Sequence, residues 1–393
     1  MAPASRGFDV SAVLDDRVRR LQRDLEAVGQ AIDAIPEGLR TRLAGAPGNE
    51  IAKKLQAIEA GLSVPLRDHG IHPADAWARA HTREIEVSAL LEEAHALVAG
   101  AALRTPAPGL HPRHGPGAGQ AAWDACGVAD ALLDELASRA TDAHWPSFTV
   151  PGVTESFVYS SRLIQVRFPR PTIWDLPATA HELGHYAART MSEFSGGRIR
   201  NLADDLHVEL DAADEASWPW LEELFADAFA AWVIGPAYGL TCITLGFDPL
   251  LANIGTASHP PGSARVRAIT MALDATKDDR LRWIANEAAK LWDRLVEVCE
   301  AEQEPEDDLV VPDSWPEKIV QLLIDHLPYG RYSTFTEAER LSSDLGAPGA
   351  DTSLADAANA AWLARIGARS GIGVEEVGHL AETTAQEIAA RGK

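Results

Sequence analysis

The chain has 393 residues and a formal net charge of −23 at pH 7, with 46 % hydrophobic and 24 % charged residues. This composition is typical of a globular protein with about two or three domains, and the acidic balance argues against nucleic acid and anionic membranes as partners. The three cysteines are widely spaced, which excludes a disulfide framework, and the N-terminus lacks the pattern of a signal peptide. We therefore expect a cytoplasmic protein.

Helical patterns dominate the first hundred residues. Hydrophobic residues over 11–35 alternate spacings of three and four, as in a coiled-coil seam, and further helices are expected over 51–62 and 74–103. We predict a helical N-terminal region over 1–104 that packs on itself, with self-association through these helices as the alternative. A Pro/Gly-rich stretch over 105–120 is the predicted linker to the next region.

After a predicted helix over 121–140, the pattern changes to short segments rich in β-branched and aromatic residues. They predict strands over 147–150, 155–160 and 163–168, the last two as a hairpin. The last segment comes shortly before the motif described next, and we expect it to be a sheet edge that pairs with an extended substrate. Its candidate substrate-binding residues are Leu163, Gln165 and Arg167.

The chemistry-bearing motif of the chain is H-E-x-x-H, within the stretch ATAHELGHYAAR over 178–189. On a helix, His181 and His185 lie one turn apart on the same face, where two imidazoles can bind one zinc ion. Glu182 lies about 100° around the helix, where its carboxylate can act as general base on a water molecule without being a ligand. We expect Asp175 to cap the N-terminus of this helix.

A catalytic zinc site also needs a third protein ligand and an open position for water. The stretch EELFADAFA over 222–230 offers Glu223 as that ligand. Asp227, one helical turn later, can accept a hydrogen bond from the far nitrogen of a ligand histidine and so orient its ring. Glu222 and His207 remain open as alternative ligands.

The third element is SHPPGSARVR over 258–267. It places His259 before two prolines and Arg265 at the start of the next predicted helix. Near a zinc-activated water, either side chain can stabilise the oxyanion of a tetrahedral intermediate. Tyr238 is a further candidate oxyanion donor, but a packed core tyrosine is the favoured interpretation of this residue.

Together, HELGH at 181–185, ELFAD at 223–227 and HPPGSAR at 259–265 resemble the zinc metallopeptidases of the gluzincin type, most closely the HtpX-like and CAAX-protease branch. The first two motifs are also similar to soluble bacterial regulatory peptidases such as the ImmA-like group. The resemblance covers roughly residues 150–275. It implies three zinc ligands, a general base, an acid behind the ligands and two residues near the transition state. In that order these are His181, His185 and Glu223; Glu182; Asp227; and His259 and Arg265.

Members of that branch have membrane helices. The stretch 228–247 carries no formal charge and is long enough to cross a bilayer, but it contains three glycines and a proline. We therefore expect a buried core helix followed by a turn. A membrane-associated protease is one alternative function, and a zinc-containing binding or regulatory protein without peptidase activity is another.

The rest of the chain is predicted to be helical, with a charged break over 302–308. We predict a mainly α fold of the α+β class. Its zincin-like core over 121–301 has a small β-sheet beside the metal-binding helix, and a helical C-terminal region follows over 302–393. The predicted function is zinc-dependent hydrolysis of peptide bonds in protein or peptide substrates, with no nucleic acid and no membrane as partner.

Overall fold

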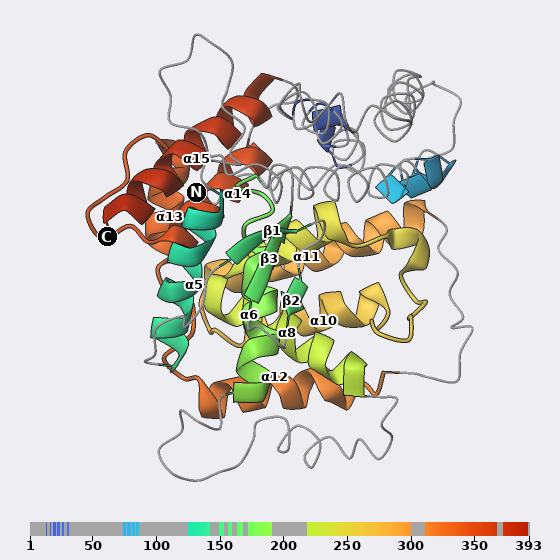
Figure 1. The fold of residues 1–393 in the computed structure, drawn as a ribbon. Helices are drawn as coiled ribbons and strands as arrows, with labels where there is room; N and C mark the ends of the chain where they lie inside the picture. Colours follow the sequence, from blue (N-terminus) through green and yellow to red (C-terminus); the bar gives the residue numbers. More distant parts are fainter. Residues whose placement is uncertain are drawn as a thin grey trace, which may run out of the picture.

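The structure is a computed structural model of the full chain (Figure 1). It describes residues 125–141, 149–152, 156–158, 163–167, 172–190, 218–299, 311–367 and 372–391, and scattered helical positions between 13 and 30 and between 74 and 85. Several predicted segments lie outside the described residues. They are the hydrophobic positions of the 11–35 seam, the helix over 51–62, the end of the helix over 74–103, the linker over 105–120, the segment with His207, and the break over 302–308.

Helices account for most of the described residues. The longer ones are α5 (Ala125–Thr141), α6 (Ala178–Thr190), α8 (Trp218–Ile234), α10 (Gly262–Asp274), α11 (Asp279–Val298), α12 (Ser314–His326), α14 (Leu354–Gly367) and α15 (Ile372–Arg391). The shorter ones are α9 (Pro236–Thr241), the π-helical turn η3 (Cys242–Gly246), the 3-10 turn η4 (Pro249–Leu251) and α13 (Phe335–Ser343). In Figure 1, α6 and α8 lie at the centre, with α5 on one side and α10 on the other.

Three short strands precede α6. They are β1 (Thr149–Gly152), β2 (Ser156–Val158) and β3 (Leu163–Arg167), in the spatial order β1-β3-β2. The predicted hairpin is confirmed, since β2 runs antiparallel to β3. The expectation that β3 is a sheet edge is wrong, because β1 pairs with its other side: Gln165 faces Val150 on one side and Ser156 on the other. Both sides of β3 are therefore paired at Gln165, and no open edge is left there for an extended substrate.

The predicted α+β class is also wrong, and the fold is helical. The strands have four, three and five residues, whereas α11 and α15 have 20 residues each. Among the described side chains of the strands, Ile164 and Val166 belong to the hydrophobic core, most of whose residues lie in helices. Strands this short bury too little apolar surface to form a layer of a zincin-like core. The β-branched residues therefore pair locally at the edge of a helical body.

The hydrophobic core draws on helices from α5 to α15. Leu323 of α12, Trp362 of α14 and Ala385 of α15 lie in the same cluster as the residues of α6 and α8. A second cluster lies around α11 and includes Val13 and Trp77 from the N-terminal part of the chain. Residues from the N-terminal and the C-terminal parts of the chain thus pack against the helices that carry the predicted motifs. The predicted domain boundaries stay predictions.

The uncharged stretch over 228–247 forms the buried end of α8, then α9 and η3. The expected buried helix is confirmed, and its break lies at Gly235. Gly235 has a φ of 87°, which favours glycine, and a Cβ there would lie 2.5 Å from the ring of Tyr332. Within the described part of the chain, no helix combines the length and the apolar character that a membrane span requires.

Candidate metal centre

The turn before α6 is closed by Asp175. Its carboxylate accepts hydrogen bonds from the backbone N and the hydroxyl of Thr172, at 2.9 and 2.7 Å, and pairs with the guanidinium of Arg20. Burial alone would raise the pKa of Asp175, but Arg20 and Thr172 outweigh it and lower the pKa. The contacts of the Asp175 carboxylate with Thr172 and Arg20 therefore stabilise the turn that precedes α6.

The helices α6 and α8 approach closely at Gly184 of the HELGH motif. A Cβ added to Gly184 would lie 2.7 Å from the Cα of Ala226, a distance that real Cβ atoms do not adopt. Ala226 lies in α8 between the two predicted acids, Glu223 and Asp227. The glycine thus allows the acids of α8 to reach the histidines of α6.

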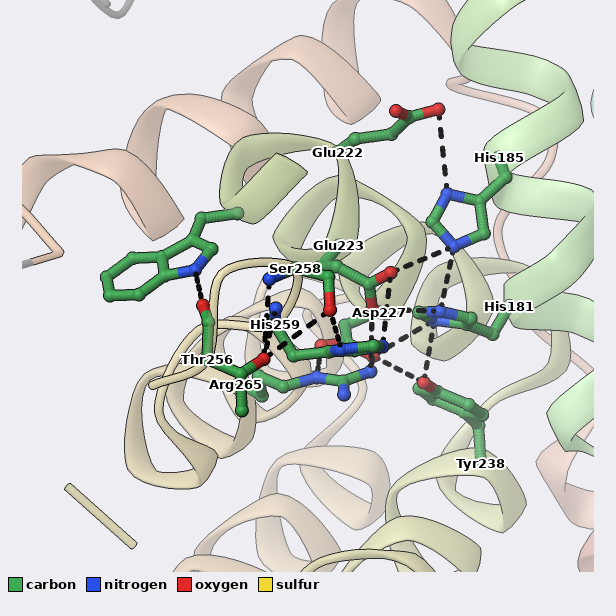
Figure 2. Close-up of polar contacts among 11 residues, drawn as sticks. His181, His185, Glu222, Glu223, Asp227, Tyr238, Thr256, Ser258, His259 and Arg265 are labelled. Atoms are coloured by element: carbon green, nitrogen blue, oxygen red, sulfur yellow. Dashed lines mark hydrogen bonds and ion pairs between the residues drawn. The ribbon is translucent and has the colours of Figure 1, made fainter. Parts of the chain in front are cut away.

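Three predicted ligands meet between these helices (Figure 2). The Nε2 atoms of His181 and His185 lie 3.1 Å apart. The carboxylate of Glu223 lies 3.3 Å from Nε2 of His181 and 3.4 Å from Nε2 of His185. A tetrahedral ion with bonds of about 2.0–2.1 Å separates its ligand atoms by roughly 3.3 Å. The group His181, His185 and Glu223 can therefore hold a metal ion.

The hydrogen bonding of the group also fits an ion. Oε2 of Glu223 is buried and accepts no well-formed hydrogen bond, although Nε2 of His181 and Nη2 of Arg265 each lie 3.3 Å away. The Nε2 atoms of His181 and His185 face the same carboxylate and also face each other. A hydrogen bond between the two nitrogens can use a proton from only one of them. Buried polar atoms left without partners are costly, and a shared cation between two nitrogens and a carboxylate oxygen removes that cost.

Asp227 lies behind His181 and is fully buried. Its Oδ1 is 3.1 Å from Nδ1 of His181, the ring nitrogen that faces away from the ligand group. The guanidinium of Arg265 donates two hydrogen bonds to the carboxylate, at 2.7 Å to Oδ2 and 2.8 Å to Oδ1. The hydroxyl of Tyr238 donates to Oδ1 as well. The structure thus places Asp227 at the centre of a polar cluster that contacts a ligand from behind.

The charges of this cluster shift the pKa values of its members. Burial alone would lower the pKa of His181, but the adjacent carboxylates of Asp227 and Glu223 outweigh it and raise the pKa to about 10. Burial alone would raise the pKa of both acids. The two ligand histidines hold the pKa of Glu223 well below its usual range, and Arg265 lowers that of Asp227. The site therefore combines ionised carboxylates with a proton that a metal ion can replace.

The loop before α10 brings His259 to the edge of the group. Its Nε2 lies 3.7 Å from Oε1 of Glu223, its Nδ1 lies 2.8 Å from the hydroxyl of Ser258, and its side chain is 52 % exposed. The indole of Trp220 holds this loop by donating to the backbone O of Thr256 at 2.6 Å. His259 therefore lies between the buried carboxylate of Glu223 and the surface of the protein.

Arg265, the second residue predicted near the transition state, lies deeper. Its side chain is 13 % exposed, packs over the ring of Phe247 at 4.8 Å, and has Nη2 at 3.3 Å from Oε2 of Glu223. The guanidinium of Arg265 is bound to Asp227, so Arg265 lies on the side of His181 that faces away from the candidate ligand group. Its predicted role as an oxyanion donor stays a prediction.

The remaining candidates have different positions. Glu182 is a buried residue of α6, on the same helix as both histidines. Glu222 lies on the far side of His185, with Oε1 3.7 Å from Nδ1, and so stands outside the group of three. The candidate substrate-binding residues Leu163, Gln165 and Arg167 lie in β3, where the structure describes their backbone.

The contact that the sequence did not predict is that of Tyr238. The packed core tyrosine favoured by the sequence is confirmed, since Tyr238 is buried in the hydrophobic core. Its hydroxyl, also considered as an oxyanion donor, donates to Asp227 and lies 3.0 Å from Nδ1 of His181. The available signal was the Gly-Pro pair at 235–236, which marks a break after the helix of Asp227 and predicts a change of chain direction there.

No protein-family model matches the chain, and neither the curated proteins nor the solved structures contain a significant match to it. The resemblance to gluzincin peptidases therefore rests on the three motifs alone and stays a prediction.

Proposed function

We propose that this protein is a zinc-dependent metallopeptidase that cleaves protein or peptide substrates. One observation carries the proposal. The three-ligand group of His181, His185 and Glu223 lies within 4.8 Å, and α6 carries a buried carboxylate, Glu182, directly beside the first ligand in the sequence. A purely structural metal site has no use for such a carboxylate, whereas hydrolysis needs a general base.

The donor set supports zinc as the ion. Two imidazole nitrogens and one carboxylate oxygen are a common set for catalytic zinc, which leaves one coordination position for water or substrate. When bound, zinc would polarise the scissile carbonyl and make a water molecule acidic near neutral pH. Each remaining part of the mechanism belongs to side chains of this chain.

Glu182 is the proposed general base. It takes the proton from the attacking water and passes it to the leaving amine. Asp227 fixes the ring of His181, since it accepts from the nitrogen that faces away from the ligand group. His259, which is half exposed and lies beside Glu223, is the proposed donor to the substrate oxyanion. Arg265 holds Asp227 in place through its two hydrogen bonds.

The substrate backbone is proposed to bind at β2. This strand is at one edge of the small sheet, and it contacts α6. An extended peptide can add to such an edge through main-chain hydrogen bonds, which accept many side-chain sequences. This replaces the predicted pairing with β3, whose two sides are already occupied.

The test compares Glu182→Gln with His181→Ala. Wild-type protein is expected to contain one zinc ion per chain and to cleave an unstructured protein. Glu182→Gln should keep its zinc and lose about 10²- to 10⁴-fold in cleavage rate, while His181→Ala should lose both zinc and cleavage. The matched control is Glu387→Gln in the exposed pair of α15, which should change neither. Full cleavage by Glu182→Gln would contradict the mechanism, and zinc without any cleavage would favour a binding protein.

A further inference from the structure

Tyr238 contacts the metal site from behind. Its ring is buried and stacks beside the ring of His181, with centroids 6.0 Å apart and planes inclined by 14°. Its hydroxyl reaches two groups: it donates to Oδ1 of Asp227 and lies 3.0 Å from Nδ1 of His181. In Figure 2, Tyr238 lies on the side of His181 that faces away from His185.

Counting protons assigns the direction of each bond. A tyrosine hydroxyl has one proton to donate, and an ionised carboxylate only accepts. Arg265 keeps Asp227 ionised through its two hydrogen bonds, so the hydroxyl proton goes to Asp227. The hydroxyl oxygen then faces Nδ1 of His181 as an acceptor. Nδ1 must therefore carry a proton, and the lone pair of a neutral His181 is left on Nε2, the atom that faces His185 and Glu223.

Asp227 alone holds this arrangement less firmly. Its Oδ1 is already shared, since Nη2 of Arg265 donates to it at 2.8 Å while Nδ1 of His181 lies 3.1 Å away. The hydroxyl of Tyr238 gives Nδ1 a second acceptor on the same side. Two acceptors on one ring nitrogen restrict the rotation of the imidazole more than one shared acceptor does.

The position of Tyr238 is itself determined from distant parts of the chain. The chain turns at Gly235, and the side-chain amide of Asn359 in α14 spans this break. It donates to the backbone O of Ile234 at 2.7 Å and accepts from the backbone N of Ala237 at 2.8 Å. At the other end of α9, the hydroxyl of Thr241 donates to the backbone O of Trp174, at 2.9 Å. Such support from several elements is what keeps a group of a binding site preorganised.

We propose that Tyr238 is a positioning residue of the metal site, whose hydroxyl fixes the tautomer and the ring orientation of His181 together with Asp227. The inference requires only that the ligand group binds a metal ion. It therefore goes beyond peptide hydrolysis and holds for a zinc-binding protein without peptidase activity as well.

A second buried tyrosine provides the matched control. The hydroxyl of Tyr332 donates to Oδ1 of the buried Asp356 at 2.8 Å, in a cluster with Thr334 and Ser353. This pair has the same chemistry as Tyr238 with Asp227, and no histidine of the ligand group contacts it among the described residues. Tyr332→Phe therefore measures the loss of a buried tyrosine hydroxyl on folding alone.

The experiment compares Tyr238→Phe and Tyr332→Phe for zinc affinity by competition with a chelator and for the absorption spectrum of the cobalt-substituted protein. Tyr238→Phe is expected to weaken zinc binding about 10- to 100-fold and to alter the cobalt spectrum, because one ligand loses its orientation. Tyr332→Phe should lower thermal stability but keep zinc affinity within about twofold of wild type. An equal loss of affinity in both variants would assign the effect to stability and overturn the proposal, as would unchanged binding by Tyr238→Phe.

A measurement on wild-type protein makes the test independent of how the variants fold. The ¹⁵N chemical shifts of the zinc-loaded protein report which nitrogen of His181 carries the proton. We expect the proton on Nδ1 and the metal on Nε2, whereas the reverse assignment would overturn the proposal. Wild-type protein that binds zinc without cleaving any substrate would contradict the proposed peptidase function and leave this inference standing.

Discussion

The guanidinium of Arg265 binds the carboxylate of Asp227 through two hydrogen bonds, Nε to Oδ2 at 2.7 Å and Nη2 to Oδ1 at 2.8 Å. Asp227 is fully buried, and the arginine side chain is 13 % exposed. A buried carboxylate is stable as an anion only when a cation and hydrogen bonds compensate for its lost hydration. This pair therefore joins α10 to α8 and keeps a charged acceptor behind the candidate metal ligands.

Arg265→Ala should lower the free energy of unfolding by about 3–5 kcal/mol, because it leaves Asp227 ionised and buried without its counterion. Urea unfolding of the metal-free protein measures this change. The matched control is Arg267→Ala, which removes an exposed arginine from the same helix and should cost about 0–1 kcal/mol. Equal losses in the two variants would show that the buried pair contributes no more than a surface pair.

Gly184→Ala should weaken metal binding, although alanine favours a helix by about 1 kcal/mol over glycine. The added Cβ would lie 2.7 Å from the Cα of Ala226, so α6 and α8 must separate, at a cost of about 1–3 kcal/mol. Glu223 would then move away from the histidines. Isothermal titration with zinc measures the affinity, and thermal unfolding measures the stability.

The control is Gly367→Ala at the end of α14, where a Cβ would meet no atom within 4 Å. This variant should be neutral or slightly stabilising and should bind zinc like wild type. If Gly184→Ala behaved in the same way, close packing at Gly184 would not be what brings Glu223 to its partners.

Zinc binding should strengthen as the pH rises. In the metal-free protein the pKa of His181 is raised to about 10, so below that pH zinc must displace a proton from the ring. Each displaced proton makes the affinity rise about tenfold per pH unit. Titration calorimetry in two buffers of different ionisation enthalpy counts the protons released. An affinity that does not change between pH 6 and pH 8 would contradict the raised pKa.

The same raised pKa has the opposite effect on the metal-free fold. A histidine whose pKa is higher in the folded state stabilises the fold fully below its unfolded pKa of about 6.5. This contribution is lost as the pH rises through the folded pKa of about 10. Metal-free protein should therefore lose stability between about pH 6.5 and 10 through His181, and the variant His181→Gln should lose this part of the pH dependence.

Arg20→Ala should destabilise the protein strongly, although Arg20 lies far in sequence from the site. Its guanidinium pairs with the buried carboxylate of Asp175 in the turn before α6 and donates to the backbone O of Leu245, at 3.3 Å. Removing it leaves a buried acid without its cation, at a cost of about 3–5 kcal/mol. The neighbour Arg19, which pairs with Asp16 nearer the surface, is the control, with an expected loss of about 0–1 kcal/mol for Arg19→Ala.

Chemical denaturation at pH 7 tests the pair. The pKa of Asp175 is lowered in the folded state, so its contribution is present at neutral pH and is lost as the pH falls. The difference between Arg20→Ala and wild type should therefore shrink in acid. A difference that stays constant down to low pH would show that Arg20 stabilises the fold through packing alone.

The arrangement of the candidate ligands within each helix was predictable because that information is local. A helix fixes the relation between His181 and His185, and the spacing of Glu223 and Asp227 places both acids on one face of a second helix. The role of Tyr238 was not predictable in this way. It depends on the change of direction at Gly235 and on Asn359, which lies 122 residues beyond the backbone N of Ala237 that it binds.

The fold class failed for a related reason. The β-branched residues around 149–167 correctly indicated strands, but their pattern does not show how far the strands extend or how much surface they bury. Likewise, β3 becomes a central strand only through its parallel pairing with β1, and pairing between separate segments is absent from a local pattern.

The amide of Asn359 also bears on the order in which the protein is made. The three candidate ligands have all been synthesised by residue 223, yet Asn359, whose amide spans the break before Tyr238, is added only with α14. During synthesis, a growing chain that ends before α14 would present its histidines and Glu223 without the hydroxyl that orients His181. If this group binds a metal ion as proposed, binding at full affinity requires that α14 has been synthesised and has docked.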